Sequence, residues 1–393
     1  MPRISLILLA GLCGRALAAQ TPDTTEAAAQ TPDTVESTAA RWRLSYFPYL
    51  SGGVNDGPVI SARVRYWRPA DYDARVTADA ALTAGAGFTL RGSRYIGAEF
   101  RAPQLRKDWR FYAKAGAERL ARYGYFGLGN TTVEDKDLVD ESHPFLYRVR
   151  RTRYLGLVEV TRRIHGPLQV ALQGSLEQVR FTSLPGPSIF VTDYPSGELE
   201  QDDGGGRLAL VYDTRDNEYN THQGLLLEGG AQVGNGGGRS YTRLYAVLRG
   251  YLSPREGTTV AVRLVGSGMG GKPTLNARFS LPTWESQLPV LGGQYSHRSF
   301  DTGRFAGKGT LFFNLEVRHD LLPFGDLGAV TLIGFMDAGR VFEQENFRLT
   351  TKDMKVGGGG GIGLRILRST IFTFNFAGGP DGFNYSVGSG WMF

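Results

Sequence analysis

The chain has 393 residues, a formal net charge of +6, 54 glycines, 11% aromatic residues and 21% charged residues. This composition favours strands and turns over helical bundles, and the absence of any long apolar run after the N-terminus excludes a membrane-spanning helix. A membrane location would therefore require a closed β-barrel.

The first forty residues have the composition of export and linker sequence. Residues 1–19 combine the basic Arg3, an apolar stretch over 4–12 and small residues before a cleavage site, which predicts a secretory signal peptide. Residues 20–40 are rich in Ala, Thr, Pro, Asp and Glu, which predicts a disordered leader. The single cysteine, Cys13, lies inside the expected signal peptide, so no disulfide is expected in the mature chain. Lipidation of Cys13 is a weaker interpretation, because Leu12 stands where a small residue is usual.

The remaining chain, 41–393, is predicted to be one β-barrel. Its apolar and aromatic residues recur at every second position between clusters of Gly, Pro, Asp and Asn, the period of a strand with one face in lipid and one in a polar lumen. About sixteen strands are expected, an even number as in bacterial single-chain barrels. They lie near 42–50, 58–68, 75–90, 93–101, 108–121, 146–163, 167–181, 204–214, 224–234, 240–253, 257–269, 309–320, 328–341, 355–367, 370–378 and 384–393.

The long connections all follow odd-numbered strands in this prediction. They span 122–145, 182–203, 270–308 and 342–354. In a barrel whose two ends face the periplasm, these segments are expected on the external side, with short turns on the periplasmic side.

The last predicted strand alternates and ends in aromatic residues, with Tyr385, Trp391 and Phe393 on one face. We expect it to close the barrel against the first strand. Such an ending resembles the signal by which outer-membrane proteins are recognised for insertion. The alternative is an ordinary strand of a soluble β-sandwich.

A charged turn follows the strand near 204–214. It contains Asp213, Arg215 and Asp216 and is followed by Gly224. Carboxylates and an arginine in a tight turn can cap one another and hold the register of a hairpin, so we interpret these four residues as a structural turn.

Several motifs together resemble the BamA/TamA-like bacterial surface antigen superfamily of outer-membrane barrels. They are Y-D-T-R-D-N at 212–217, H-R-S-F at 297–300, F-M-D-A-G at 335–339, the glycine run 357–361 and, more weakly, Y-F-G-L-G-N at 125–130. The leader is too short for the family's periplasmic modules, so the resemblance is to members without POTRA domains.

The resemblance implies that the segment 270–308 is an external loop folded back into the lumen. Arg298 is then the lumen arginine, beside Phe300, and Glu316 and Asp337 are its partners on the barrel wall. Ser299 stands where the family has glycine. The alternative is that Glu316 and Asp337 are only hydrated by water in the lumen. The glycine run is expected to leave room for the loop, since no Gly-Lys-Ser/Thr follows it as in a phosphate-binding loop.

No catalytic or metal-binding constellation is predicted. The five histidines form no close pair, and no serine has the setting of a nucleophile. Arg148 and Arg150 are expected to face the lumen, whereas Arg151 and Arg153 have the opposite parity, which implies a bulge or a position above the bilayer. Arginines on the external side are candidates for holding lipopolysaccharide phosphates or, equally, for a solvated strand end.

The chain is thus predicted to be all-β, a transmembrane antiparallel β-barrel of the Gram-negative outer membrane with one long external loop folded into its lumen. The resemblance implies assistance in inserting or translocating proteins or lipids, without chemistry, cofactor or metal. The seam between the first and last strands would include Gly388, Gly390 and Phe393. Expected partners are outer-membrane lipids, lipopolysaccharide, client outer-membrane proteins or a separate periplasmic protein, and not nucleic acid. A passive channel or a structural or adhesive surface barrel is the alternative function.

Overall fold

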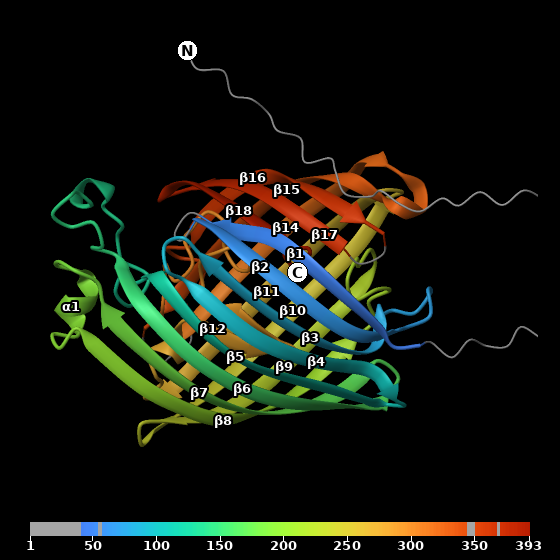
Figure 1. Ribbon diagram of the computed structural model, residues 1–393, viewed down its shortest axis with the longest axis horizontal. Helices are drawn as coiled ribbons and strands as arrows, with labels where there is room; N and C mark the ends of the chain where they lie inside the picture. The colour runs from blue at the N-terminus through green and yellow to red at the C-terminus, as the bar shows by residue number, and fades with distance from the viewer. Residues whose placement is uncertain (1–40, 54–56, 344–349, 368–369) are drawn as a thin grey trace, which may run out of the picture. The chain divides into compact units, whose positions relative to one another are not determined.

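The barrel is visible in a computed structural model that describes residues 41–53, 57–343, 350–367 and 370–393 (Figure 1). The expected signal peptide (1–19) and leader (20–40) lie outside the described residues. In the described part, sixteen antiparallel strands form one closed sheet. They are β1 (Arg43–Gly53), β2 (Gly57–Pro69), β3 (Ala78–Thr89), β4 (Arg94–Arg106), β5 (Trp109–Gly124), β6 (Arg148–His165), β7 (Leu168–Ser183), β8 (Glu198–Asp213), β9 (Gly224–Gly236), β10 (Arg239–Arg255), β11 (Thr258–Gly271), β14 (Gly309–Pro323), β15 (Gly328–Phe342), β16 (Lys355–Ile366), β17 (Thr370–Gly379) and β18 (Gly382–Ser389).

The strands follow one another around the barrel in chain order, with one interruption inside the long segment before β14. There, β12 (Ser280–Thr283) and β13 (Ser286–Pro289) pair only with each other, and β11 pairs directly with β14. The few helical turns are short: η1 (Lys136–Leu138), α1 (Ile189–Asp193), η2 (Asn276–Arg278) and η3 (Gly325–Leu327). Within the described ranges, no helix has the length and hydropathy of a membrane-spanning helix.

Side chains alternate between lipid and lumen, as β9 illustrates. Leu225, Leu227 and Val233 point outward and are 43, 39 and 60% exposed, whereas Glu228 and Gln232 point inward and are buried. An outward leucine finds lipid in place of water, and an inward carboxylate finds polar partners in the lumen. The period-two pattern is therefore the physical cause of the barrel, and the sequence prediction of an all-β barrel is confirmed.

The lumen contains protein rather than open space. Residues 272–308, called here the lumen segment, return into the barrel between β11 and β14. Leu291, Phe300 and Phe305 of this segment are 1% exposed and pack with Val265 and Phe312 of the wall. A core therefore exists inside the barrel.

The outer loop after β5 lies over the lumen segment. Gly129 donates its N–H to the carbonyl of Ala306 at 2.8 Å, and Asn130 accepts the N–H of Val341 at 3.1 Å. Arg304 donates to Asp381 and, at 2.9 Å, to the hydroxyl of Thr132. These contacts connect the weakly matching motif 125–130 to the external end of the lumen segment.

Each of the sixteen predicted strands corresponds to a barrel strand, and the larger differences lie at the end of β4, which reaches Arg106 rather than 101, at the start of β8 and at the end of β18. β8 begins at Glu198, whereas the sequence predicted a start near 204. The prediction was late because the first residues of β8 carry charges on both faces and lack the apolar alternation. The last strand ends at Ser389 rather than at 393.

Candidate functional site

The central feature of the lumen is Arg298. Its main-chain N–H and its Nε each donate to Oδ2 of Asp337, at 2.9 and 3.0 Å, and its Nη2 donates to Oδ1 at 2.9 Å. Its Nη1 donates to Glu316. The guanidinium carbon also lies 3.5 Å from the ring centre of Phe335. The two carboxylates that the sequence indicated thus both contact Arg298, and all three side chains are at most 2% exposed.

The charges of this cluster balance. Glu316 also accepts a hydrogen bond from Nε of Arg318 at 2.7 Å, and Asp337 accepts one from the side-chain amide of Asn314 at 2.8 Å. Two arginines therefore meet two carboxylates in a site closed to water. This pairing offsets the cost of burying the four charges, since desolvation of an unpaired charge costs several kcal/mol.

The residues beside Arg298 fit closely against the glycine-rich wall. The hydroxyl of Ser299 donates to the carbonyl of Gly378 at 2.9 Å, and a Cβ placed on Gly357 would lie 2.0 Å from that hydroxyl oxygen. Serine at this position adopts no left-handed backbone conformation, so glycine is not required there. Phe300 packs edge-on against Phe305 with ring centres 5.1 Å apart. Glycine in β16 therefore provides the space that the lumen segment occupies.

The seam between β1 and β18 is short. Among the described residues, register pairs join Gly52 to Val387 and Gly53 to Ser386, whereas β1 and β2 share eleven pairs. Figure 1 shows β1 (blue) beside β18 (red), where the two ends of the sheet meet. Toward the periplasmic end, the ring of Phe47 lies 6.1 Å from that of Phe372 in β17. In the described residues, most of β1 therefore has a hydrogen-bonded neighbour on one side only.

The end of β18 turns into the lumen, which corrects the predicted strand 384–393. Gly390 follows the strand with a φ of +84°, a conformation that glycine adopts without strain. Beyond it, the indole N–H of Trp391 donates to the side-chain oxygen of Asn220 at 2.8 Å. The main-chain oxygen of Phe393 accepts from Arg318 at 3.0 Å, and Arg263 lies over the Phe393 ring at 4.7 Å. Phe393 is therefore a lumen residue and not part of the seam.

Gly388, the third predicted seam residue, does lie in β18. It faces inward, because a Cβ on Gly388 would approach the side chain of Gln294 in the lumen segment to 2.9 Å. The seam and the lumen segment are thus in direct contact at this strand.

The predicted turn residues come together between β8 and β9. Arg215 donates to both carboxylate oxygens of Asp213, at 2.9 and 3.0 Å. Asp216 accepts the N–H groups of Asn217 and His222, at 2.8 and 3.0 Å. Gly224 has a φ of +108°, and a Cβ on it would lie 2.4 Å from a carbonyl oxygen, so only glycine fits. The turn is held by paired charges at the periplasmic end of the barrel.

The comparison with protein families addresses this same region. A model described as the Omp85 superfamily domain matches residues 78–379, which include the turn, the lumen arginine and both carboxylates. The chain belongs to the Omp85 superfamily. It is accordingly a β-barrel of the outer membrane, in a superfamily concerned with inserting or translocating proteins there.

Solved structures share the Omp85 barrel at low sequence identity. The crystal structure of BamA from Haemophilus ducreyi lacking POTRA domains 1–3 is 13% identical, with a TM-score of 0.55 over 89% of this chain and 71% of that one. CdiB from Escherichia coli is 11% identical, with a TM-score of 0.53 over 89 and 63% of the two chains. CdiB from Acinetobacter baumannii is 13% identical, with a TM-score of 0.51 over 88 and 60%. The chain thus spans less than two thirds of either CdiB chain, and these similarities show the fold. Comparison with curated proteins gave no match.

A second anchor of the lumen segment was missed by the sequence analysis. At the tip of the β12–β13 hairpin, the N–H of Trp284 donates to Glu228 at 2.8 Å, and the N–H of Glu285 donates to Glu159 at 3.1 Å. Both acids are also paired with the buried Arg207. The hairpin tip is thus attached to β6, β8 and β9, on a different part of the wall from Arg298.

The hairpin tip also connects to the periplasmic turn. The carboxylate of Glu285 accepts from Nε of Arg110 at 2.9 Å, and the same guanidinium donates to both oxygens of Glu218, at 2.8 and 2.9 Å. Burial tends to raise the pKa of Glu218, but the opposite charge and hydrogen bonds of Arg110 outweigh it and lower that pKa to about 2. One arginine therefore joins the lumen segment to the turn between β8 and β9.

The sequence contains part of the information that predicts this second anchor. Glu159, Arg207 and Glu228 all stand at inward positions of predicted strands, so their charges had to be compensated inside the barrel. Their partners lie far away in sequence and could not be named. Similarly, the expectation that Arg150 faces the lumen was wrong: Arg151 and Arg153 face inward, toward Glu118 and Glu177.

The described residues include no group of three or more His, Cys, Asp or Glu side chains placed to hold a metal ion. The charged clusters are instead arginine–carboxylate pairs. Such pairs attach one segment to another, so the arrangement can hold or release the lumen segment.

Proposed function

We propose that this Omp85 barrel assists the insertion of other polypeptides into the outer membrane at the seam between β1 and β18. The observation that carries the proposal is the two-pair register between these strands. The unpaired backbone edge of β1 is a template to which another extended chain can add, and each ladder hydrogen bond contributes about 1 kcal/mol.

The filled lumen supports a lateral route over a route through the barrel. One cavity inside the described lumen, beside Arg249 and Trp284, has a volume of about 190 Å³. In the described part of the chain, the lumen segment is attached at Arg298 and again at the hairpin tip, so it occupies the interior of the barrel. A passive channel, the alternative function, is therefore less well supported.

The decisive test is to close the seam covalently. Cysteines at Gly52 and Val387, in a Cys13→Ser chain, sit at register partners, and cross-strand Cα atoms about 4.5 to 5.5 Å apart suit a disulfide. The purified protein is reconstituted in liposomes, and the folding rate of a second, urea-denatured outer-membrane protein is measured before and after oxidation. Oxidation should abolish the acceleration, and a reductant should restore it.

The matched control is a disulfide in a fully paired part of the barrel. Leu227 and Leu248 are register partners on the outward face of β9 and β10. Cysteines at these positions should form a disulfide without changing the folding rate of the client. Equal acceleration by the oxidised and reduced seam variants would contradict the proposal, and acceleration no greater than that of an unrelated porin would favour a structural barrel.

A further inference from the structure

We propose that the outward face of β4 to β7 binds a phosphate-bearing lipid of the external leaflet through Arg94 and Arg119. These two arginines are direct register partners on β4 and β5. Directly opposed side chains have Cβ atoms about 5 Å apart, and like charges in this position repel each other. A bridging anion removes that repulsion.

The outward orientation of the pair follows from its neighbours. Glu118 precedes Arg119 and pairs with Arg151, which in turn donates to Asn276 of the lumen segment at 3.3 Å. Glu118 therefore faces the lumen. Because side chains alternate along a strand, Arg119 faces lipid, and its register partner Arg94 faces the same side.

No acid compensates these two charges. In the described part of the chain, neither Arg94 nor Arg119 has a hydrogen bond or ion pair from its side chain. The same row continues through Thr152 to Arg180. Arg180 has its own partner in Glu200, on the neighbouring strand. Within this row, the positive charge without an acidic partner therefore lies on β4 and β5.

Additional positive charge lies nearer the external rim. Arg150 follows the inward Val149 and precedes the inward Arg151, so it faces outward from β6. Its Nε is buried and has no hydrogen-bond partner. A phosphate group carries several acceptor oxygens and can be held by more than one guanidinium.

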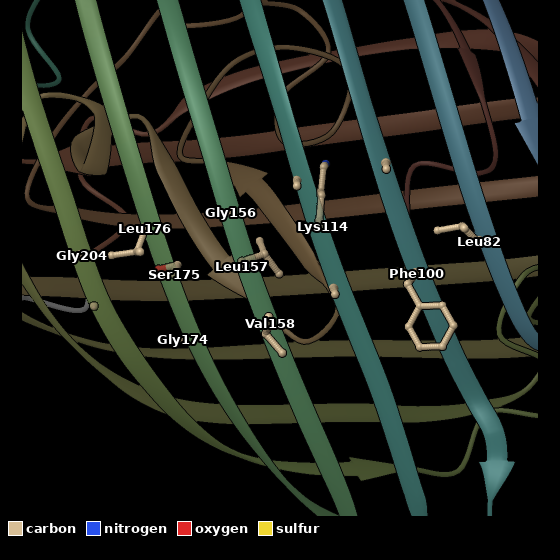
Figure 2. Close-up of a pocket in the computed structure, with 14 residues that line it drawn as sticks. Leu82, Phe100, Lys114, Gly156, Leu157, Val158, Gly174, Ser175, Leu176 and Gly204 are labelled. Carbon is tan, nitrogen blue, oxygen red and sulfur yellow. The ribbon is translucent and has the colours of Figure 1, made fainter.

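An apolar depression lies farther along the same strands, on the same outward face as the arginine pair. Its floor is formed by small residues such as Ala98, Ala115 and Gly156, and its sides by Phe100, Val158 and Leu176. Figure 2 shows Phe100, Val158 and Leu176 among the residues that line the depression, together with Gly156, Gly174 and Gly204, which have no side chain. The depression has a volume of about 740 Å³.

The spacing matches a lipid better than a free anion. Ala98 and Ala115 stand four residues along the strand from Arg94 and Arg119 respectively, a distance of about 13 Å at the rise of a β-strand. A headgroup phosphate at the arginines would therefore place acyl chains over the depression. Charge complementarity and the apolar floor together identify the occupant as an anionic lipid, and in the external leaflet lipopolysaccharide has this chemistry.

The binding test uses the purified full-length protein in detergent. Native mass spectrometry measures retention of lipopolysaccharide, of dephosphorylated lipopolysaccharide and of phosphatidylethanolamine, with inorganic phosphate as a competitor. The double variant Arg94→Gln, Arg119→Gln should lose about tenfold in retention of lipopolysaccharide, the loss of one or two charge-assisted hydrogen bonds. Arg106→Gln, at the periplasmic end of β4, removes the same charge from an exposed site and should change nothing.

The depression is tested separately by filling it. A Cβ on Gly156 or Gly174 would meet no atom within 4 Å, so Gly156→Leu and Gly174→Leu should fold normally. Both should weaken retention of lipopolysaccharide while leaving its competition by inorganic phosphate unchanged.

Three results would overturn the proposal. The first is unchanged retention of lipopolysaccharide in the double arginine variant, and the second is equal retention of dephosphorylated lipopolysaccharide. The third is complete displacement of lipopolysaccharide by inorganic phosphate together with no effect of the leucine variants. This third result would indicate a site for a soluble anion. None of these results depends on the seam. Heat-modifiable migration in electrophoresis verifies that each variant is folded.

Discussion

Arg298 is 2% exposed, and the two carboxylates that it contacts are equally buried. Removing one member of such a cluster leaves the others charged in a site without water, which costs about 3–5 kcal/mol. An exposed pair such as Arg180 and Glu200 is screened by solvent and contributes little. The burial of a charged side chain, more than the number of its partners, therefore decides how much its removal destabilises the barrel.

Arg298→Ala should release the lumen segment, because Asp337 and Glu316 then lose their shared partner. The expected result is a higher single-channel conductance in planar bilayers and a lower temperature of heat-modifiable unfolding. Arg180→Ala should leave both unchanged. A variant with wild-type conductance would show that the hairpin tip alone holds the segment.

The attachment at Glu218 should depend on pH. Its pKa in the folded chain, about 2, is lower than the ordinary value of 4.5, so the stabilisation is complete above about pH 4.5 and is lost as the pH falls toward 2. Unfolding temperatures measured from pH 6 to pH 2 should decline less steeply in Glu218→Gln than in the wild type. Parallel profiles would contradict this assignment.

At the scale of elements, glycines decide where segments approach one another. Gly357 gives room to Ser299, and Gly363 gives room to Trp391, since a Cβ there would lie 2.7 Å from the indole ring. Gly334, in contrast, faces open space. Gly334 in β15 should therefore tolerate a larger residue, whereas Gly363 in β16 should not.

Gly363→Ala should displace Trp391 and loosen the inward turn after Gly390. In a chain carrying Met392→Cys, labelling by a membrane-impermeable maleimide should accelerate. Gly334→Ala is the matched control and should leave the labelling rate unchanged. Equal rates in both variants would mean that Trp391 adapts without leaving its position.

Sequence pattern was sufficient for the strands but not for this inward turn. Lipid and lumen impose a local alternation, so each strand could be located from its own residues. The same alternation continues through Trp391 and Phe393, and it cannot distinguish a lipid-facing aromatic from one that turns inward at Gly390. The start of β8 was missed for a related reason, since Glu200 and Asp202 stand outward beyond the apolar alternation.

The site was predictable to the extent that motifs carried it. Resemblance named Arg298 with Glu316 and Asp337, which the structure brings into contact. It did not indicate Trp284 and Glu285, because their position depends on the path of the whole lumen segment. Non-local packing of this kind leaves no short pattern in the sequence.

For the whole molecule, stability should be uneven around the barrel. β1 shares eleven register pairs with β2 but two with β18. Hydrogen–deuterium exchange should therefore be faster in the amides of β1 than in those of β6, which has long ladders on both sides. Uniform protection would contradict a weak seam.

The two anchors of the lumen segment give it the role of a brace. The hydrogen bonds and ion pairs described for it end on strands from β4 to β18, or on the outer loops, and not on β1, β2 or β3. Most of the circumference is thus stiffened from inside. The three strands on the β1 side of the seam, β1 to β3, lack this internal support and are more flexible. Any mechanical load from the surrounding bilayer will be taken up there, so the barrel is built to yield at one side only.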